Sequence, residues 1–328
     1  MKKKILNLFK YLFFFLIGIT IFWFIYKDQN IEELKSILKN DVDYKWIWLS
    51  LFLGLLSHIS RTIRWGYLIE TLGHKPRFAN SFCAVMVAYF MNLALPRMGE
   101  ISRCGVMSRY ENISFSKLVG TVVVERLIDM VMLLLFVLVI IVAQFGEVLR
   151  LLKENPSFQQ ALIDKVTSPV AIISLVTVVA LVFIFRKAFK NTPLYKKAHG
   201  FWLNLLEGIQ TIRKMEKKGA FIFHSVFIWV MYYLMLYVVF FSFDFTSHLS
   251  AIAGLTTFVI AAFGMVAPVQ GGIGAWHFMA TKALAIYGVA EHNGEIFALV
   301  NWSSMNLMIL FLGLVATMAL PFLNRKKI

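Results

Sequence analysis

Three charged residues interrupt an otherwise apolar stretch of the sequence at Glu125, Arg126 and Asp129. On a helix, Glu125 and Asp129 share one face, and Arg126 reaches Asp129 across one turn. Charges inside a bilayer are costly, so they face protein or water and commonly mark a transport pathway or a proton relay. We therefore assign these three residues to gating or coupling, with a purely structural ion cluster as the alternative.

Arg61 and Arg64 form a second group suited to an anionic ligand. They are three residues apart and share a helix face next to Trp65. The planar guanidinium group matches phosphate oxygens with paired hydrogen bonds, so both arginines are candidates for binding a lipid phosphate, and Trp65 is counted with them as substrate-binding. The alternative is that they only anchor the end of a helix at the membrane surface.

A polar segment broken by proline and glycine, Asn92–Arg103, follows the next apolar run. Pro96 ends one helix, Gly99 permits close backbone approach, and the helix that restarts presents its positive N-terminal dipole to the membrane interior. Such an end binds anions, and a lipid phosphate is the natural one. A structural pair between Glu100 and Arg103 is the alternative. The candidate substrate-binding residues here are Asn92, Pro96, Arg97, Gly99, Glu100 and Arg103.

A glycine-rich break, Pro268–His277, interrupts the second half in the same way. Gly271, Gly272 and Gly274 leave backbone N–H groups bare, which favours an anion-binding nest. No strand precedes them and the Lys-Ser/Thr pair of a nucleotide loop is missing, which argues against nucleotide binding. We assign His277 to gating as a titratable group, with a packed histidine as the alternative. A matched pair of broken segments points to a transport site.

Composition identifies the chain as a polytopic, all-α membrane protein. It has 328 residues, of which 59% are hydrophobic and 16% charged, with a mean hydropathy of +0.72. Apolar runs long enough to cross a bilayer recur from end to end. The sequence predicts one integral membrane domain over residues 1–328, with full transmembrane spans at 5–26, 46–64, 118–144, 168–186, 219–243 and 296–320.

We expect each broken segment to enter and leave the membrane on one side. Region 79–114 would form a re-entrant hairpin from the inside, and region 250–290 would form one from the outside. The two halves, about 1–144 and 168–328, would then be an inverted repeat. The alternative is eight ordinary spans, two of them kinked.

The formal net charge of +15 is distributed to suit a membrane rather than a nucleic acid. Basic residues concentrate in alternate loops, which predicts that both termini are cytoplasmic. The Phe-rich, Lys-rich composition, with 31 Phe, favours an AT-rich bacterium and hence the inner membrane of one. Residues 196–218 combine an apolar face with basic ends, which is typical of an amphipathic helix on the inner leaflet or of a basic connector.

No metal or cofactor is predicted. Cys83 and Cys104 lie in or beside membrane segments and offer neither a disulfide framework nor a metal-ligand spacing. The seven histidines are dispersed, without a His-x-x-x-His pair. No nucleophile–base set appears in the sequence, so we name no catalytic residue and do not expect an enzyme.

Four motifs follow one another in the order of a known family, and the chain resembles that family over nearly its whole length. They are Arg61-x-x-Arg64-Trp65, Asn92-x-x-x-Pro96-Arg97-x-Gly99-Glu100-x-x-Arg103, Glu125-Arg126-x-x-Asp129 and Pro268-x-x-Gly271-Gly272-Ile273-Gly274. The family is the lysylphosphatidylglycerol synthase transmembrane region. The resemblance implies a membrane domain that moves a lipid or a lipid-linked precursor between leaflets: aminoacylated phosphatidylglycerol in the fused synthases, and dolichol-phosphate-linked sugars in archaeal relatives.

The sequence departs from the family pattern in two places. The fused synthases continue into a soluble aminoacyl-transferase domain, whereas this sequence stops at Ile328, so we do not expect it to make lysyl-lipid. Many relatives also have a carboxylate shortly after the glycine turn, where this chain has Trp276 and His277.

The leading hypothesis is a lipid flippase without ATP hydrolysis of its own. The anionic head group would bind to Arg61, Arg64, Arg97 and Arg103. Two other classes stay open: a membrane transferase acting on a lipid phosphate, and a non-transporting subunit that presents its amphipathic helix to a soluble enzyme. Membrane lipids are the expected partners, with a second copy of the chain or a separate lipid-modifying enzyme as further partners.

Overall fold

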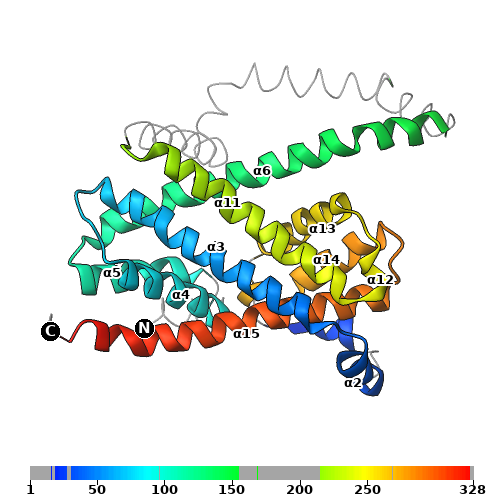
Figure 1. Cartoon of the computed structure of the whole chain (residues 1–328), viewed down its shortest axis with the longest axis horizontal. Coiled ribbons are helices and arrows are strands. Elements are labelled where there is room, and N and C mark those ends of the chain that lie inside the picture. The colour runs from blue at the N-terminus through cyan, green and yellow to red at the C-terminus, as the bar shows by residue number, and fades with distance from the viewer. Residues whose placement is uncertain are drawn as a thin grey trace. The chain divides into compact units, whose positions relative to one another are not determined.

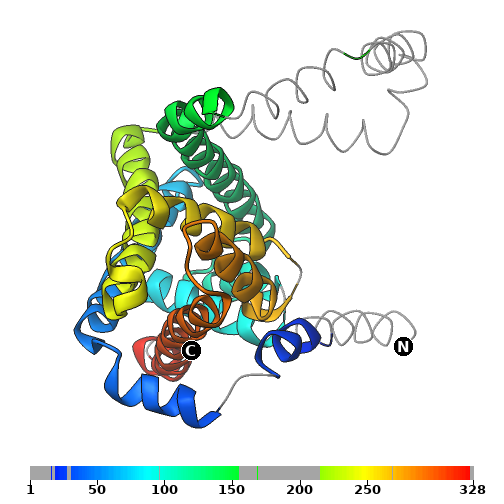
Figure 2. The same cartoon turned by 90° about the vertical axis from the view of Figure 1, so that its right-hand side faces the viewer.

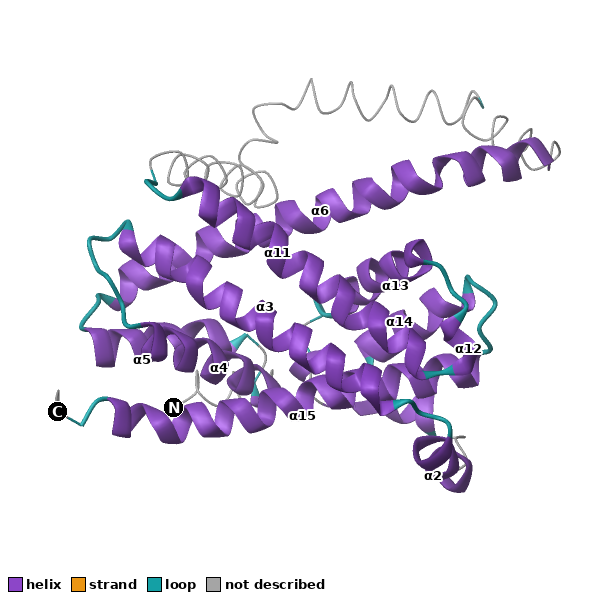
Figure 3. Cartoon of the chain, in the orientation of Figure 1, coloured by secondary structure: helices purple, strands orange, loops and turns teal. Residues whose placement is uncertain are grey.

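The computed structural model describes residues 16, 19–27, 31–95, 97–154, 168, 215–267 and 269–325. These residues form helices, turns and loops without any strand, as the all-α prediction requires (Figure 3). The chain divides into two compact units, one of residues 1–134 with 215–328 and the other of residues 135–214. Every contact given below lies within the first unit.

Among the described residues, four helices are long and apolar enough to cross a membrane. They match the predicted spans 46–64, 118–144, 219–243 and 296–320. The helices are α3 (Tyr44–Glu70), α6 (Phe115–Glu154), α11 (Lys218–Tyr237), which continues into the 3-10 helix η1 (Val238–Ser242), and α15 (Glu291–Leu323). The spans predicted at 5–26 and 168–186 and the amphipathic helix predicted at 196–218 fall largely outside the described residues, so the total of six spans stays a prediction.

A defined cap begins α3. The Asp43 carboxylate accepts a hydrogen bond from the Lys45 backbone N–H at 3.2 Å, which satisfies one of the free donors at the start of the helix. The Lys45 ammonium lies 2.6 Å from the same carboxylate, and its hydrogen bond keeps the pKa of Asp43 below its usual range. The cap is therefore ionised at neutral pH.

The long helices pack through small residues. Helices α3 and α11 lie side by side (Figure 1, Figure 2), and Ser50 of α3 donates to the Met235 carbonyl at 2.6 Å. A Cβ at Gly54 would lie 2.7 Å from the Met235 sulfur. Gly313 lets α15 approach Phe90 of the neighbouring short helix equally closely. Small residues at such contacts are how helices associate in lipid, where no hydrophobic force drives them together.

Two pairs of shorter helices accompany the long ones. The first pair is α4 (Phe78–Ala94) and α5 (Met98–Glu111); the second is α13 (Ala251–Gly264) and α14 (Ala275–Ala285), separated by the 3-10 helix η2 (Gln270–Gly272). At 1.5 Å per residue, each is about 16 to 26 Å long, shorter than the roughly 30 Å hydrocarbon core. Two minor helices, α2 (Ile31–Asn40) and α12 (Asp244–Ser247), and a helical stretch at residues 19–26 are described as well.

The first pair has both of its ends beside the C-terminal end of α15. Asn80, near the start of α4, exchanges two amide hydrogen bonds with Asn324, at 3.1 and 2.9 Å. Arg77 precedes α4 and lies 3.3 Å from Glu111, the last residue of α5. The chain therefore leaves this pair close to where it entered.

The second pair begins beside α11 and ends beside the start of α15. Lys282 in the last turn of α14 pairs with Glu291, the first residue of α15. Tyr233 of α11 donates to the carbonyl of Ala251, the first residue of α13, at 3.0 Å. The two pairs thus open toward opposite ends of α15, as Figure 1 shows.

The two chain breaks meet on the middle of α15. The Gly271 carbonyl accepts a hydrogen bond from the Trp302 indole at 2.8 Å. A Cβ on Gly271 would lie 2.9 Å from the Leu93 side chain, near the end of α4. Contact of η2 with α4 therefore joins the tips of the two pairs.

Candidate functional site

A buried cluster of ion pairs joins α3 to α6. Arg61 places one nitrogen 2.9 Å from Glu125 and the other 3.0 Å from Asp129. Arg64, one turn along, lies 3.0 Å from Glu125 and 2.8 Å from Asp129. Each predicted pair shares a helix face as its spacing requires, and the two faces are turned toward each other.

Arg103 reaches the same cluster from α5. Its Nη1 lies 2.7 Å from Oε2 of Glu125, so three arginines surround that carboxylate. The Arg103 guanidinium also lies over the Trp65 ring, 4.7 Å from its centre, and the Trp65 indole is fixed by a 3.0 Å hydrogen bond to Thr121. Glu125 and Arg64 are completely buried.

The buried cluster carries one positive charge too many. Three arginines, Arg61, Arg64 and Arg103, oppose the two carboxylates of Glu125 and Asp129. A buried charge without a counter-charge is costly, so an anion beside the cluster would stabilise it. In the described part of the chain, Arg103 Nη2 has no hydrogen-bond acceptor, which leaves a donor available for that anion.

An outer ion pair lies beside the cluster. Arg126 of α6 lies 3.0 Å from Glu100 of α5 and 3.8 Å from Asp129. Arg126 is half exposed, with 48% of its side chain accessible. Glu100 therefore pairs with Arg126 instead of with Arg103, its neighbour on the same helix. The cross-helix partners are closer because α5 turns both residues toward α6.

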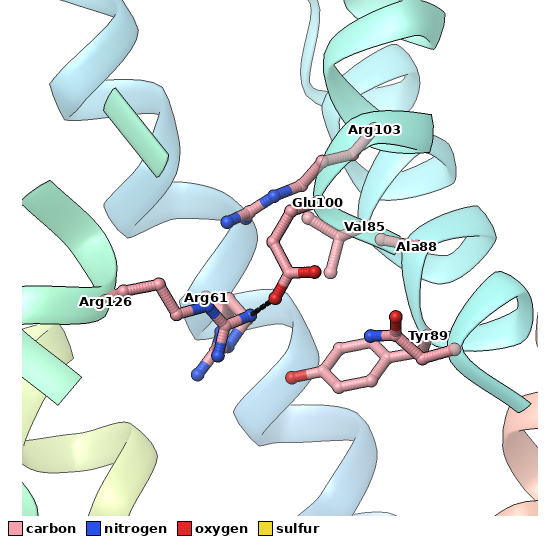
Figure 4. A pocket seen from close by; sticks show the side chains of 8 residues that line it. Arg61, Val85, Ala88, Tyr89, Glu100, Arg103 and Arg126 are labelled. Atoms are coloured by element: carbon pink, nitrogen blue, oxygen red, sulfur yellow. Dashed lines mark ion pairs between the residues drawn. The ribbon is translucent and has the colours of Figure 1, made fainter. Parts of the chain in front are cut away.

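A small pocket opens between these charges. Figure 4 shows Arg61, Arg103 and Arg126 reaching it from three helices, with Glu100 and Tyr89 beside them. The remaining lining residues are Val85, Ala88 and Asn92. The free space is about that of one water molecule, so a phosphate fits only after the side chains separate.

Residues of the break between α4 and α5 pack against and hydrogen-bond to one another. Asn92 accepts a hydrogen bond from the Gly99 N–H at 2.8 Å, which occupies one donor of the predicted anion site. Gly99 packs so closely on Ala88 and Asn92 that no side chain would fit there. Arg97 is exposed at the helix cap with a left-handed φ of 64°, and the structure does not bring it to the cluster. Pro96 lies outside the described residues.

The second break forms a packed joint away from the cluster. The Gly274 N–H donates to His277 Nδ1 at 3.3 Å, and Gly272 packs against Met265. The buried His277 ring is surrounded by aromatic rings, with centroids at 5.0 to 5.9 Å from those of Phe22, Tyr26, Trp276 and Trp302. His277 thus has the surroundings of a packed histidine, and Gly271 belongs to the same joint. Pro268 lies outside the described residues.

Sequence reasoning did not find two tyrosines of the site. Tyr89 of α4 and Tyr232 of α11 join their hydroxyls at 2.7 Å, and each ring lies 5.9 Å from the Arg61 guanidinium. Nothing in the local sequence sets them apart, because only the packing of α4 and α11 on α3 brings them to Arg61. In the described ranges, no group of three or more His, Cys, Asp or Glu side chains is arranged to hold a metal ion.

Comparison with known proteins identifies the family. The UPF0104 membrane protein MJ1595 of Methanocaldococcus jannaschii is 30% identical over 115 residues, and the match covers 34% of this chain and 34% of that protein. No solved structure matches the chain significantly. The family described as the lysylphosphatidylglycerol synthase TM region matches residues 11–313. The chain, a multi-pass membrane protein, therefore belongs to the lysylphosphatidylglycerol synthase TM-region family.

Proposed function

We propose that this protein is a lipid transporter that moves an anionic phospholipid, or a lipid-linked precursor with a phosphate, between the two leaflets. The observation that carries the proposal is the buried cluster with its excess positive charge beside a pocket lined by arginines. Membership of a family named for a lipid synthase supports a lipid as the ligand. The protein would act without a cofactor and without making or breaking a covalent bond.

The ion pairs provide a mechanism of exchange. The head group would displace Glu100 from Arg126 and bind between Arg61, Arg103 and Arg126. Guanidinium groups suit this role because they donate paired hydrogen bonds to phosphate oxygens. The carboxylate of Glu125 would hold the inner arginines in place when the pocket is empty. The site then exists in two states with similar numbers of ion pairs, which is what reversible binding needs.

We also propose that the two pairs of short helices are re-entrant hairpins within a fold of six spans, related as an inverted repeat. Three observations support this arrangement: the lengths of the helices, the contact of the two tips, and the ends of the pairs, since the first pair begins and ends beside the C-terminal end of α15 and the second ends beside its start. Arg77 lies beside Asn324 at the end of α15, Lys217 lies beside Glu70 at the end of α3, and basic residues favour the cytoplasmic side. The protein would thus lie in a bacterial inner membrane with both termini in the cytoplasm.

Cysteine labelling tests this topology. Single cysteines are introduced into a variant in which Cys83 and Cys104 are replaced by serine, at Lys75, Arg97, Ser114, His248 and Ala290. We expect a membrane-impermeant maleimide to reach positions 75 and 114 only from the cytoplasmic face, and positions 248 and 290 only from the outer face. The tip at 97 should not react from outside. Labelling of 97 from outside would instead mean that α4 and α5 span the membrane fully.

Reconstitution tests transport. We expect liposomes that contain the purified protein to flip a labelled phosphatidylglycerol, aminoacyl-phosphatidylglycerol or polyprenyl phosphate faster than empty liposomes do. The rate at which labelled diacylglycerol flips should be the same with and without protein, because this lipid has no phosphate. Chemical analysis of the same lipids should show no turnover. Equal rates with and without protein for every phosphate lipid would refute the proposal, and conversion of a lipid would establish the enzymatic alternative.

A further inference from the structure

His58 is a buried titratable residue that the ion-exchange mechanism does not use. It lies on α3, three residues before Arg61, and is 4% exposed. Among the described residues, neither of its ring nitrogens has a hydrogen-bond partner. An imidazole always has at least one N–H donor, and leaving it buried and unpaired is costly, so such a residue indicates an exchangeable proton or a water.

The surroundings of His58 connect it to the pocket. Its ring lies on the ring of Tyr89, with centroids 4.6 Å apart, and Tyr89 lines the anion pocket. The Tyr89 hydroxyl meets that of Tyr232 at 2.7 Å, and both rings face Arg61 at 5.9 Å. A charge on His58 is therefore separated from the excess charge of the cluster by one aromatic layer.

Few other charges act on His58. In the described part of the chain, the groups that act on it directly are Tyr89 of α4, through its ring, and Arg61 of α3, through its charge. Arg61 in turn faces Tyr232 of α11 and pairs with Glu125 and Asp129 of α6. Helix α5 also touches α3, with Arg103 over the Trp65 ring, and its Glu100 pairs with Arg126. The elements η1 and α15 pack on α3 as well, and neither η1 nor the part of α15 after Glu295 contains a charged residue. Burial and the excess charge at Arg61 both disfavour a proton on His58, and of the two only the charge at Arg61 changes when an anion binds.

We propose that His58 is a proton-binding site that couples lipid transport to the movement of protons, an inference that rests on the proposed function. With the pocket empty, the excess positive charge beside Arg61 repels a second one, and His58 is neutral. A bound phosphate cancels that charge, and the imidazole then takes up one proton from water as imidazolium. When the phosphate leaves, the proton returns to water. One singly charged lipid and one proton move as a neutral pair, and a proton gradient supplies the energy.

Linkage gives this proposal a measurable consequence. If anion binding favours protonation, protonation favours anion binding by the same factor. We expect the affinity of the full-length protein for a short-chain phosphatidylglycerol to weaken by up to about 10-fold per pH unit between about pH 6 and 8. This phosphodiester keeps its single charge throughout that range. In weakly buffered solution, binding should withdraw close to one proton per lipid bound.

Two variants locate the proton. His58→Gln should bind the probe with a pH-independent affinity and without proton uptake, and His58→Asn is a second form if the glutamine variant does not fold. His224→Gln is the matched control: His224 lies on α11, half-buried, and its ring nitrogen is already paired with Ser60 at 2.8 Å. Its pH dependence and proton uptake should equal those of the wild type.

The possible outcomes distinguish failure of proton coupling at His58 from failure of the proposed anion site. Binding by the wild type without proton uptake would overturn the role of His58 and leave the anion site intact. Proton uptake that persists in the His58 variants would overturn it equally. Absence of probe binding by the wild type at every pH would remove the proposed anion site, and the coupling with it.

Discussion

Replacement of Glu125 by glutamine is expected to lower the free energy of unfolding by about 3 to 5 kcal/mol, which is typical when one partner of a buried ion pair is removed. Three arginines lie within 3.0 Å of this carboxylate, and the residue is completely buried. Without its charge, only Asp129 opposes them, and the excess buried charge doubles. The effect is measured as a lower unfolding temperature of the purified protein in detergent, with the loss of monodispersity on heating as the readout.

Glu100→Gln is the matched control for this prediction. Glu100 is also a carboxylate paired with an arginine at 3.0 Å, but its partner Arg126 is half exposed and 27% of the Glu100 side chain is accessible. Exposed pairs contribute about 0 to 1 kcal/mol, so stability should change little. Equal losses in the two variants would mean that burial does not set the importance of these pairs, which would contradict the reading of Glu125 as the centre of the cluster.

Replacement of Arg103 by lysine should slow lipid translocation by about 10- to 100-fold while the protein still folds. Lysine keeps the positive charge opposite Glu125, so the net charge of the cluster does not change. It removes the planar fork, the unpaired Nη2 donor and the stacking on Trp65. A lost hydrogen bond to a charged group costs about 1.5 to 3 kcal/mol, which corresponds to this range of rates. The translocation rate in proteoliposomes, normalised to reconstituted protein, is the measurement.

Arg109→Lys controls for a change of this kind on the same helix. Arg109 lies in the last turn of α5, is exposed, and contacts the Tyr110 ring, away from the pocket. Its variant should translocate lipid at the wild-type rate. A normal rate for Arg103→Lys would show that the fork at this position does not bind the head group, and the pocket would lose its strongest candidate ligand.

Helix periodicity was enough to predict which charged residues share a face. Arg61 and Arg64 project together from α3, and Glu125 and Asp129 project together from α6, as their spacings require. Periodicity contains no information on which faces meet. Spacing alone therefore assigns the arginines to the ligand and the carboxylates to gating, whereas the structure joins all four in one cluster.

At the chain breaks too, the sequence pattern predicts where a helix ends but not which residues come into contact. Proline and glycine indicated where the helices stop, and α4 ends two residues before Pro96. The direction of the chain at the break depends on contacts between its two sides. Asn92 caps Gly99, and the left-handed conformation of Arg97 turns its side chain outward. Neither contact follows from composition, so Arg97 was grouped with arginines that lie elsewhere.

The contact between the two breaks has a consequence for the leakage of ions through the protein. Leu93 and Gly271 touch, and Trp302 fastens Gly271 to α15, so the tip of one helix pair is a wall for the other. If one helix pair moves outward to admit a head group, the tip of the other pair gains room to move in the same direction. That movement would narrow the entrance on the opposite face of the membrane. Entrances on both faces would then not stand open together. The contact between the tips would thus enforce alternating access, and no continuous water path for ions would form through the protein.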